Sequence, residues 1–173
     1  MSQTKKITLS AMMVALGAVL MRLGVMIEVL DLTVCALASL MVVFIYLEIG
    51  SYYPWLVWIC TSIATALTGA GIVAVEYFLV FGIYPLLKSY VERLPKWSWI
   101  LVKLAFINSI IWILFLISEY IIGMNFFGEE TPVMVVVVYV LMNVAFIAYD
   151  LFLTTMVRFY YIKVRPKIKK MLK

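Results

Sequence analysis

Histidine is absent from the 173-residue chain, and its absence excludes several common kinds of site. Without it the protein has no histidine-based zinc site, no Ser-His-Asp triad and no histidine proton relay. The chain also lacks a glycine-rich phosphate loop of the P-loop type, so it carries no motif for driving transport with its own ATP hydrolysis. We therefore predict no catalytic residues, no metal and no cofactor, and we expect a protein that is not an enzyme.

Cysteine and charge are scarce as well. Cys35 and Cys60 lie in separate apolar runs without CxxC spacing, which indicates neither a disulfide framework nor a zinc site. Charged residues make up only 13% of the chain, and seven of the 14 basic residues fall in its last 16 positions, after an apolar run. Such a tail suits a membrane surface that contains anionic lipid, and we expect no nucleic-acid partner.

Apolar residues dominate what remains. Hydrophobic side chains make up 66% of the sequence, far above the share in ordinary globular domains. A helix needs roughly 20 residues to cross the hydrocarbon core of a bilayer, so the length accommodates about six spans with short loops. The sequence predicts an all-α integral membrane protein, a bundle of about six transmembrane helices in a single domain over residues 1–173. We expect a multi-pass protein of the cell membrane.

The predicted spans alternate with short loops that contain turn residues or charges. They cover about residues 7–23, 32–47, 53–68, the apolar part of 71–96, 97–122 and 133–161. Basic residues cluster at 88–96 and in the C-terminal tail, and cation-rich ends remain on the cytoplasmic side. This distribution predicts that both termini are cytoplasmic. It also predicts that the acidic segment 24–31, a loop or a frayed helix end, and the loop with Glu129 and Glu130 are external.

Polar residues inside the predicted spans indicate where a binding site would lie. A charge in hydrocarbon costs a few kcal/mol even on lenient scales, so such residues should face protein or a water-filled cavity. Two sets recur at helical spacing and so share one helix face each: Asn108, Trp112, Phe115 and Glu119, and Tyr139, Asn143, Phe146 and Asp150. With Glu76 and Tyr77 of the fourth span, these faces predict a small-molecule pocket that opens outward.

Structural explanations compete with this interpretation for several residues. Glu76 and Glu119 can be solvated near the outer surface, where charge costs less than at mid-depth. Asp150 lies deeper, and it can pair structurally with Asn108 or Lys103. Lys103 can also extend to the inner interface by itself. Four tryptophans are expected to serve in helix packing or as interfacial anchors: Trp55, Trp58, Trp97 and Trp99.

The pocket residues predict a ligand type. Glu76, Glu119 and Asp150 favour a neutral or cationic ligand. Three aromatic side chains can stack on a flat heterocycle or face a cationic ring, and Asn143 can add a directional hydrogen bond; the aromatics are Trp112, Tyr77 and Tyr139. Arg22 opposes this prediction, because a guanidinium that turned into the pocket would neutralise an acid or bind a ligand carboxylate.

Small residues recur along the first predicted span. Ser10, Ala11, Ala15 and Ala18 are three or four residues apart, which leaves one helix side with little bulk. Another transmembrane helix can approach such a surface closely.

The sequence combines four features: a basic N-terminus before TLSAMMVALGAVL, a size of about six spans, an acidic external segment after the first span, and the stretch FGIYPLLKSYVERLPKW. Together they resemble the S components of energy-coupling factor (ECF) vitamin transporters. The resemblance covers most of the chain. It implies a substrate-binding subunit of an ABC-type importer in a bacterial cytoplasmic membrane, with a vitamin-like or other small micronutrient held on the outer side by the last three helices and covered by loop 24–31.

The same resemblance implies partner subunits. In that family the small-residue surface of the first helix, here Ala11, Ala15 and Ala18, packs against a transmembrane T component, which two ATPase subunits drive. The alternative is a non-transport membrane scaffold of the rod-shape-determining type, whose polar residues would serve helix packing and partner binding.

Overall fold

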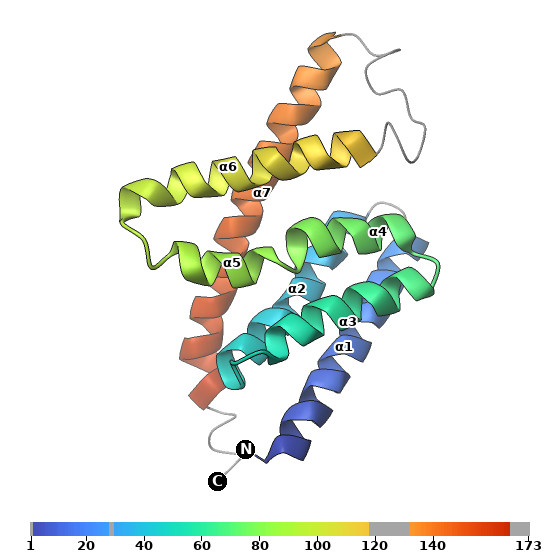
Figure 1. Cartoon of the computed structure of the whole chain (residues 1–173), viewed down its shortest axis with the longest axis vertical. Helices are drawn as coiled ribbons and strands as arrows, with labels where there is room; N and C mark the ends of the chain where they lie inside the picture. Colours follow the sequence, from blue (N-terminus) through green and yellow to red (C-terminus); the bar gives the residue numbers. More distant parts are fainter. Residues whose placement is uncertain (1, 28–29, 118–131, 167–173) are drawn as a thin grey trace. The chain divides into compact units, whose positions relative to one another are not determined.

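A computed structural model of the chain describes residues 2–27, 30–117 and 132–166, and every regular element in them is helical (Figure 1). Five helices of this described part are long and apolar enough to cross a membrane: Gln3–Met26, Asp31–Glu48, Gly71–Val91, Trp97–Ile117 and Val135–Val164. A further apolar helix, Tyr53–Leu67, has only 15 residues, about 22 Å against a hydrocarbon core of about 30 Å. The fold is therefore all-helical and fits a membrane protein, with five spans of full length and one shorter helix.

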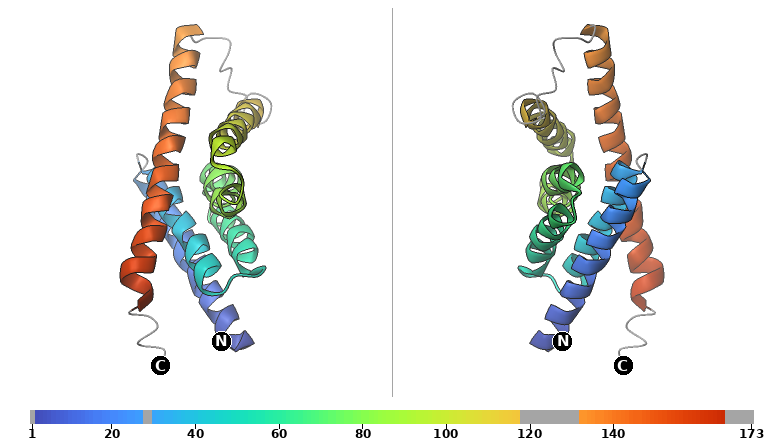
Figure 2. Two further views of the ribbon diagram at one scale, coloured as in Figure 1. Left: turned by 90° about the vertical axis from the view of Figure 1, so that its left-hand side faces the viewer. Right: turned by 90° about the vertical axis from the view of Figure 1, so that its right-hand side faces the viewer.

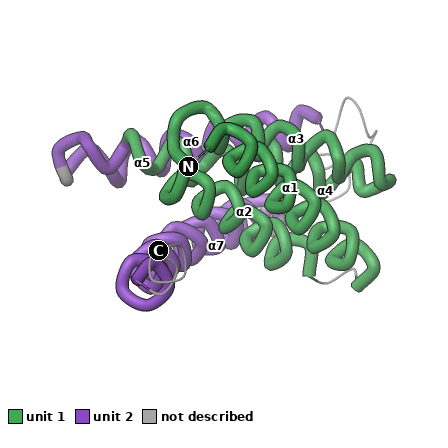
Figure 3. Tube along the Cα trace, turned by 90° about the horizontal axis from the view of Figure 1, so that it is seen from below, with its two compact units in different colours: residues 1–90 green, residues 91–173 purple. Residues whose placement is uncertain are grey.

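The chain divides into two compact units, residues 1–90 and 91–173 (Figure 3). Unit 1 contains α1 (Gln3–Met26), α2 (Asp31–Glu48), α3 (Tyr53–Leu67), α4 (Gly71–Glu76) and the π-helix η1 (Tyr77–Phe81), and α5 (Tyr84–Val91) follows. Unit 2 contains α6 (Lys96–Ile117), α7 (Pro132–Phe159) and the π-helix η3 (Tyr160–Val164). Each unit is described by itself.

In unit 1, α1 packs side by side with α2 and α3 (Figure 2). Glycines make this close contact possible. A Cβ atom on Gly24 of α1 would lie 2.8 Å from a methyl carbon of Val34, and one on Gly17 would lie 3.0 Å from the methyl carbon of Thr61. Because small residues let backbones approach, α1 meets α2 through one glycine and α3 through the other.

The α2–α3 and α3–α4 connections are short turns that contain residues with positive φ. The α2–α3 turn contains Gly50 and Ser51, with φ of 65° and 58°, and the α3–α4 turn contains Gly69 at φ 84°. The two glycines adopt this left-handed conformation at little cost, whereas Ser51 adopts it despite its side chain. Of the two alternatives for segment 24–31, a loop or a frayed helix end, its first residues are helical, since α1 continues to Met26 and α2 begins at Asp31.

Unit 2 is built on the antiparallel pair α6 and α7. Lys103, near the start of α6, contacts Asp150, which is late in α7, while Asn108 further along α6 contacts the earlier Tyr139. Contacts that advance along one helix and retreat along the other define antiparallel packing. The pair therefore brings the polar residues of the two longest apolar segments of the unit together.

Candidate functional site

The fourth predicted span is interrupted near its middle by the π-helix η1. In an α-helix the Gly82 N–H would donate to Phe78, but here it donates to the Tyr77 carbonyl, at 2.7 Å. The Phe78 carbonyl instead accepts a hydrogen bond from the indole Nε1–H of Trp58 in α3, at 3.1 Å. A side chain from a neighbouring helix thus satisfies a backbone group at the interruption, as it must in a membrane.

Aromatic packing reinforces the same contact. The rings of Trp58 and Phe78 stack with centroids 4.6 Å apart, and Trp55 meets Trp58 edge-on at 5.8 Å. A Cβ atom on Gly82 would lie 2.4 Å from Cδ1 of Trp58 and 2.9 Å from Cε1 of Tyr77, so only glycine fits beside the indole. Trp58 is buried and serves in packing, rather than as an interfacial anchor.

Glu76 and Tyr77 adjoin this interruption. Glu76 is the last residue of α4, is partly buried and lies near enough to Asp31 of α2 for their charges to interact. Tyr77 begins η1 and is completely buried, with its hydroxyl close to that of Thr61 but outside hydrogen-bonding geometry. The Cys35 thiol of α2 donates to the Val73 carbonyl at 3.9 Å, which places α2 against α4 one turn before Glu76.

Arg22 belongs to the same end of unit 1. Its Nη1 atom lies 4.0 Å from the place where a Cβ atom on Gly69 would be, so the side chain of α1 reaches the α3–α4 turn. Near the same end, α2 packs against both α1 and α4. Asp31 has a carboxylate oxygen, Oδ1, that is buried and accepts no hydrogen bond within the described part of the chain. One cation and two acids therefore occupy this end.

In unit 2, Asn108 is the centre of a polar contact between α6 and α7. Its Oδ1 atom accepts hydrogen bonds from the Tyr139 hydroxyl at 2.5 Å and from Asn143 Nδ2 at 3.3 Å. Asn143 also donates to the Tyr139 carbonyl within α7 at 3.0 Å. Next along the pair, the rings of Phe106 and Phe146 lie 6.2 Å apart. The predicted face of α7 is thus turned toward α6.

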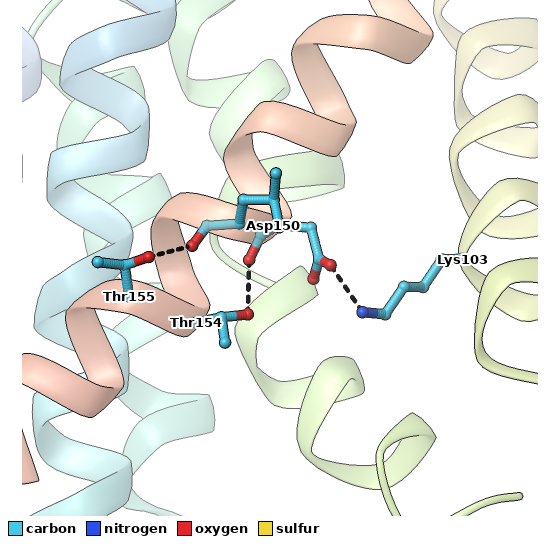
Figure 4. A network of polar contacts seen from close by, with 5 residues as sticks. Lys103, Asp150, Thr154 and Thr155 are labelled. Carbon is cyan, nitrogen blue, oxygen red and sulfur yellow. Dashed lines mark hydrogen bonds and ion pairs between the residues drawn. The ribbon is translucent and has the colours of Figure 1, made fainter. Parts of the chain in front are cut away.

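An ion pair completes this interface. Lys103 Nζ lies 2.7 Å from Asp150 Oδ2, and the two side chains are 15% and 17% exposed (Figure 4). Thr154 donates to the Asp150 carbonyl at 2.9 Å, and Lys103 also lies 5.9 Å from the ring centroid of Trp99. Of the alternatives that the sequence left open for Asp150, the structural pairing with Lys103 is the one observed. Lys103 does not simply extend to the interface.

The remaining predicted site residues occupy different environments. Trp112 is 59% exposed, whereas Phe115 of the same predicted face is buried, so α6 directs only part of that face into the unit. Glu119 lies outside the described residues. Within the small-residue surface of α1, Ala18 is buried in the unit, whereas Ala11 and Ala15 are exposed.

The sequence did not predict the helix interruption at Gly82 or the hydrogen bond from the Trp58 indole to the Phe78 carbonyl. A signal for the interruption exists, because Gly82 and Pro85 both fall inside an otherwise apolar span, and such residues mark breaks. The identity of the residue that satisfies the freed carbonyl carries no comparable signal, since Trp58 lies 20 residues away in sequence.

Two polar sites therefore emerge, one in each unit. The first combines Arg22, Asp31 and Glu76 with the interrupted helix, and the second is the Asn108 and Lys103 interface of α6 with α7. The chain matches no family model, no curated protein and no solved structure.

Proposed function

We propose that the protein is the substrate-binding S component of an ECF-type importer, which captures a vitamin-like or other small micronutrient on the outer side of a bacterial cytoplasmic membrane. The interrupted span α4–η1–α5, with Glu76 directly before the π-helix, carries this proposal. Discontinuous helices in membranes occur where backbone lines a site, and π-turns are frequent at functional positions. A carboxylate beside such a break is a means of holding a solute.

The side chains near the break favour a particular ligand chemistry. Asp31 and Glu76 supply two carboxylates against the single guanidinium of Arg22, which suits a neutral or cationic ligand. In a transport cycle the acids would bind a ligand amine or ring nitrogen, and Arg22 would select against excess positive charge or accept a carboxylate from a zwitterion. The π-turn would let the two halves of the span adjust to the ligand without losing all backbone hydrogen bonds.

Mass spectrometry of small molecules that co-purify with the detergent-solubilised protein would identify the ligand. Its affinity would then be compared by calorimetry between the parent protein and Glu76→Gln. We expect at least a tenfold loss of affinity, since a charge-assisted hydrogen bond contributes about 1.5–3 kcal/mol. Glu92→Gln, an exposed acid in the turn after α5, is the matched control and should bind normally. Absence of any co-purifying ligand, or equal affinity in both variants, would count against the proposal.

The orientation follows from the charges and is tested separately. We expect both termini and the turn at Arg93 on the cytoplasmic side, and position 129 outside. In a background with Cys35→Ala and Cys60→Ser, a single cysteine at 93 should react with an impermeant maleimide only after the inner side is opened. A cysteine at 129 should react in intact cells. The reverse pattern would invert the proposed orientation.

Delivery through a shared module requires a surface for the T component and its two ATPase subunits. Ala11 and Ala15 are exposed on α1 and lack bulk, so a partner helix can approach them. Ala11→Leu or Ala15→Leu should prevent co-purification of the T component and uptake while ligand binding continues. Ala145→Leu, at an exposed alanine of α7, should leave assembly intact. Normal assembly in both α1 variants would remove this surface from the proposal.

A further inference from the structure

The end of α7 and η3 hold two aromatic–cation pairs. Lys163 Nζ lies 5.5 Å from the ring centroid of Phe159, and the Arg165 guanidinium carbon lies 5.0 Å from that of Tyr161. In each pair the cation follows its aromatic partner by four residues, which places the two side chains over each other on a helix. Both rings are well exposed, Phe159 at 48% and Tyr161 at 44%.

The two pairs surround the helix rather than forming one patch. Residues two apart fall on roughly opposite sides of a helix, and this also holds in the wider π-helix Tyr160–Val164, so Phe159 with Lys163 and Tyr161 with Arg165 lie on roughly opposite sides. Arg158, which directly precedes Phe159 in the sequence and is also exposed, adds a third cation. A positive collar with exposed aromatic rings thus encircles the end of an apolar segment that is long enough to cross a membrane.

This combination matches the boundary between hydrocarbon and headgroups. Aromatic rings are enriched at that depth, and cations close to it attract anionic lipid. A ring beneath each cation also holds it in place near the helix, so less freedom is lost when a phosphate binds. A collar that faces several directions suits lipids around the helix better than a single soluble anion, which would meet only one side.

We propose that this collar binds the headgroup phosphates of anionic phospholipids and selects them over zwitterionic lipids. The inference does not depend on the ligand that the protein carries or on which side of the membrane the collar faces. It predicts that lipids with net negative charge are enriched around η3 and remain with the protein through extraction from a bilayer.

The test uses the full-length protein in nanodiscs that contain equal amounts of phosphatidylglycerol and phosphatidylcholine. Native mass spectrometry after release measures the ratio of the two retained lipids. The parent protein should retain the anionic lipid preferentially, and Lys163→Gln/Arg165→Gln should lower that ratio about fivefold or more, since each cation near the surface contributes a factor of about five. Thermal melting of each variant verifies that it remains folded.

Two matched variants separate the collar from net charge. Lys5→Gln/Arg93→Gln removes the same charge from residues outside α7 and η3, and it should lower the ratio by less than half as much as the collar variant. Phe159→Leu/Tyr161→Leu keeps every charge and should lower the ratio about two- to threefold through loss of the aromatic supports. An equal effect of the two charge-removing pairs would reduce the phenomenon to net charge and overturn the proposal. No preference for phosphatidylglycerol in the parent protein would also overturn it.

Discussion

Substitution of Gly82 by alanine tests the contact that stabilises the interrupted span. The backbone of Gly82 has φ −82° and ψ −37°, a conformation open to any residue, so alanine is not excluded by the backbone. The obstacle is the neighbouring indole, because the new methyl carbon would lie 2.4 Å from Cδ1 of Trp58. Trp58 would have to move, and its hydrogen bond to Phe78 and its ring stacking would be lost.

The expected cost can be assembled from these contacts. Overpacking in a close-packed site costs about 1–3 kcal/mol, the lost hydrogen bond costs about 1 kcal/mol, and the aromatic pair about 0.5–1.5 kcal/mol. Alanine recovers about 0.5–1 kcal/mol relative to glycine through reduced backbone entropy. We expect Gly82→Ala to lower the free energy of unfolding by about 1.5–5 kcal/mol, with the contact to Trp58 as the cause.

Unfolding in mixed micelles with increasing SDS, followed by tryptophan fluorescence, measures this difference. Gly71→Ala is the matched control, since a Cβ atom at Gly71 meets nothing within 4 Å, and its stability should change by less than about 0.5 kcal/mol. In a Trp58→Leu background the cost of Gly82→Ala should fall below about 1 kcal/mol, because the obstructing ring is gone. Equal stability of the Gly82 and Gly71 variants would refute the reasoning.

Three further predictions concern helix contacts and use the same unfolding assay. Lys103→Met should destabilise by about 2–4 kcal/mol because it removes the ammonium group that contacts Asp150, and adding Asp150→Leu should restore much of that loss; a double variant as unstable as the single one would contradict this. Asn108→Leu should lower the free energy of unfolding about twice as much as Tyr139→Phe, by about 1.2 against about 0.6 kcal/mol. The reason is that Asn108 accepts two interhelical hydrogen bonds, whereas the Tyr139 hydroxyl donates one. Equal costs would argue against the shared acceptor. Gly24→Ala should cost about 1–3 kcal/mol by forcing α1 from a valine methyl of α2, and a neutral result would mean that these helices are not so close.

The local pattern of residues predicted the features that depend on one helix at a time. Long apolar runs predicted the all-helical fold, because a backbone that crosses hydrocarbon must satisfy its own hydrogen bonds. The spacing of Tyr139, Asn143, Phe146 and Asp150 correctly placed them on one face, which is a property of helix periodicity alone. Turn residues likewise predicted the breaks near Gly50 and Gly69.

Tertiary structure decided which residue meets which. The sequence left Asp150 open to Asn108, to Lys103 or to a ligand, and the packing of α6 on α7 joins it to Lys103 while Asn108 pairs elsewhere. Helix periodicity fixes the direction of a side chain but not the depth at which two helices register, so partner choice depends on the docked pair. The same limit explains why Trp112, on a predicted pocket face, is largely exposed.

The interruption of the fourth span depends partly on its own sequence and partly on the packing of another helix. Gly82 and Pro85 indicate from the sequence that the helix is weak there, but a break within an apolar span is stable only if another group satisfies the released carbonyl. That group is the indole of Trp58, supplied by a helix that lies 20 residues earlier in the chain. Composition therefore determined that the segment could cross a membrane, and the packing of α3 against it determined where it departs from the α-helix.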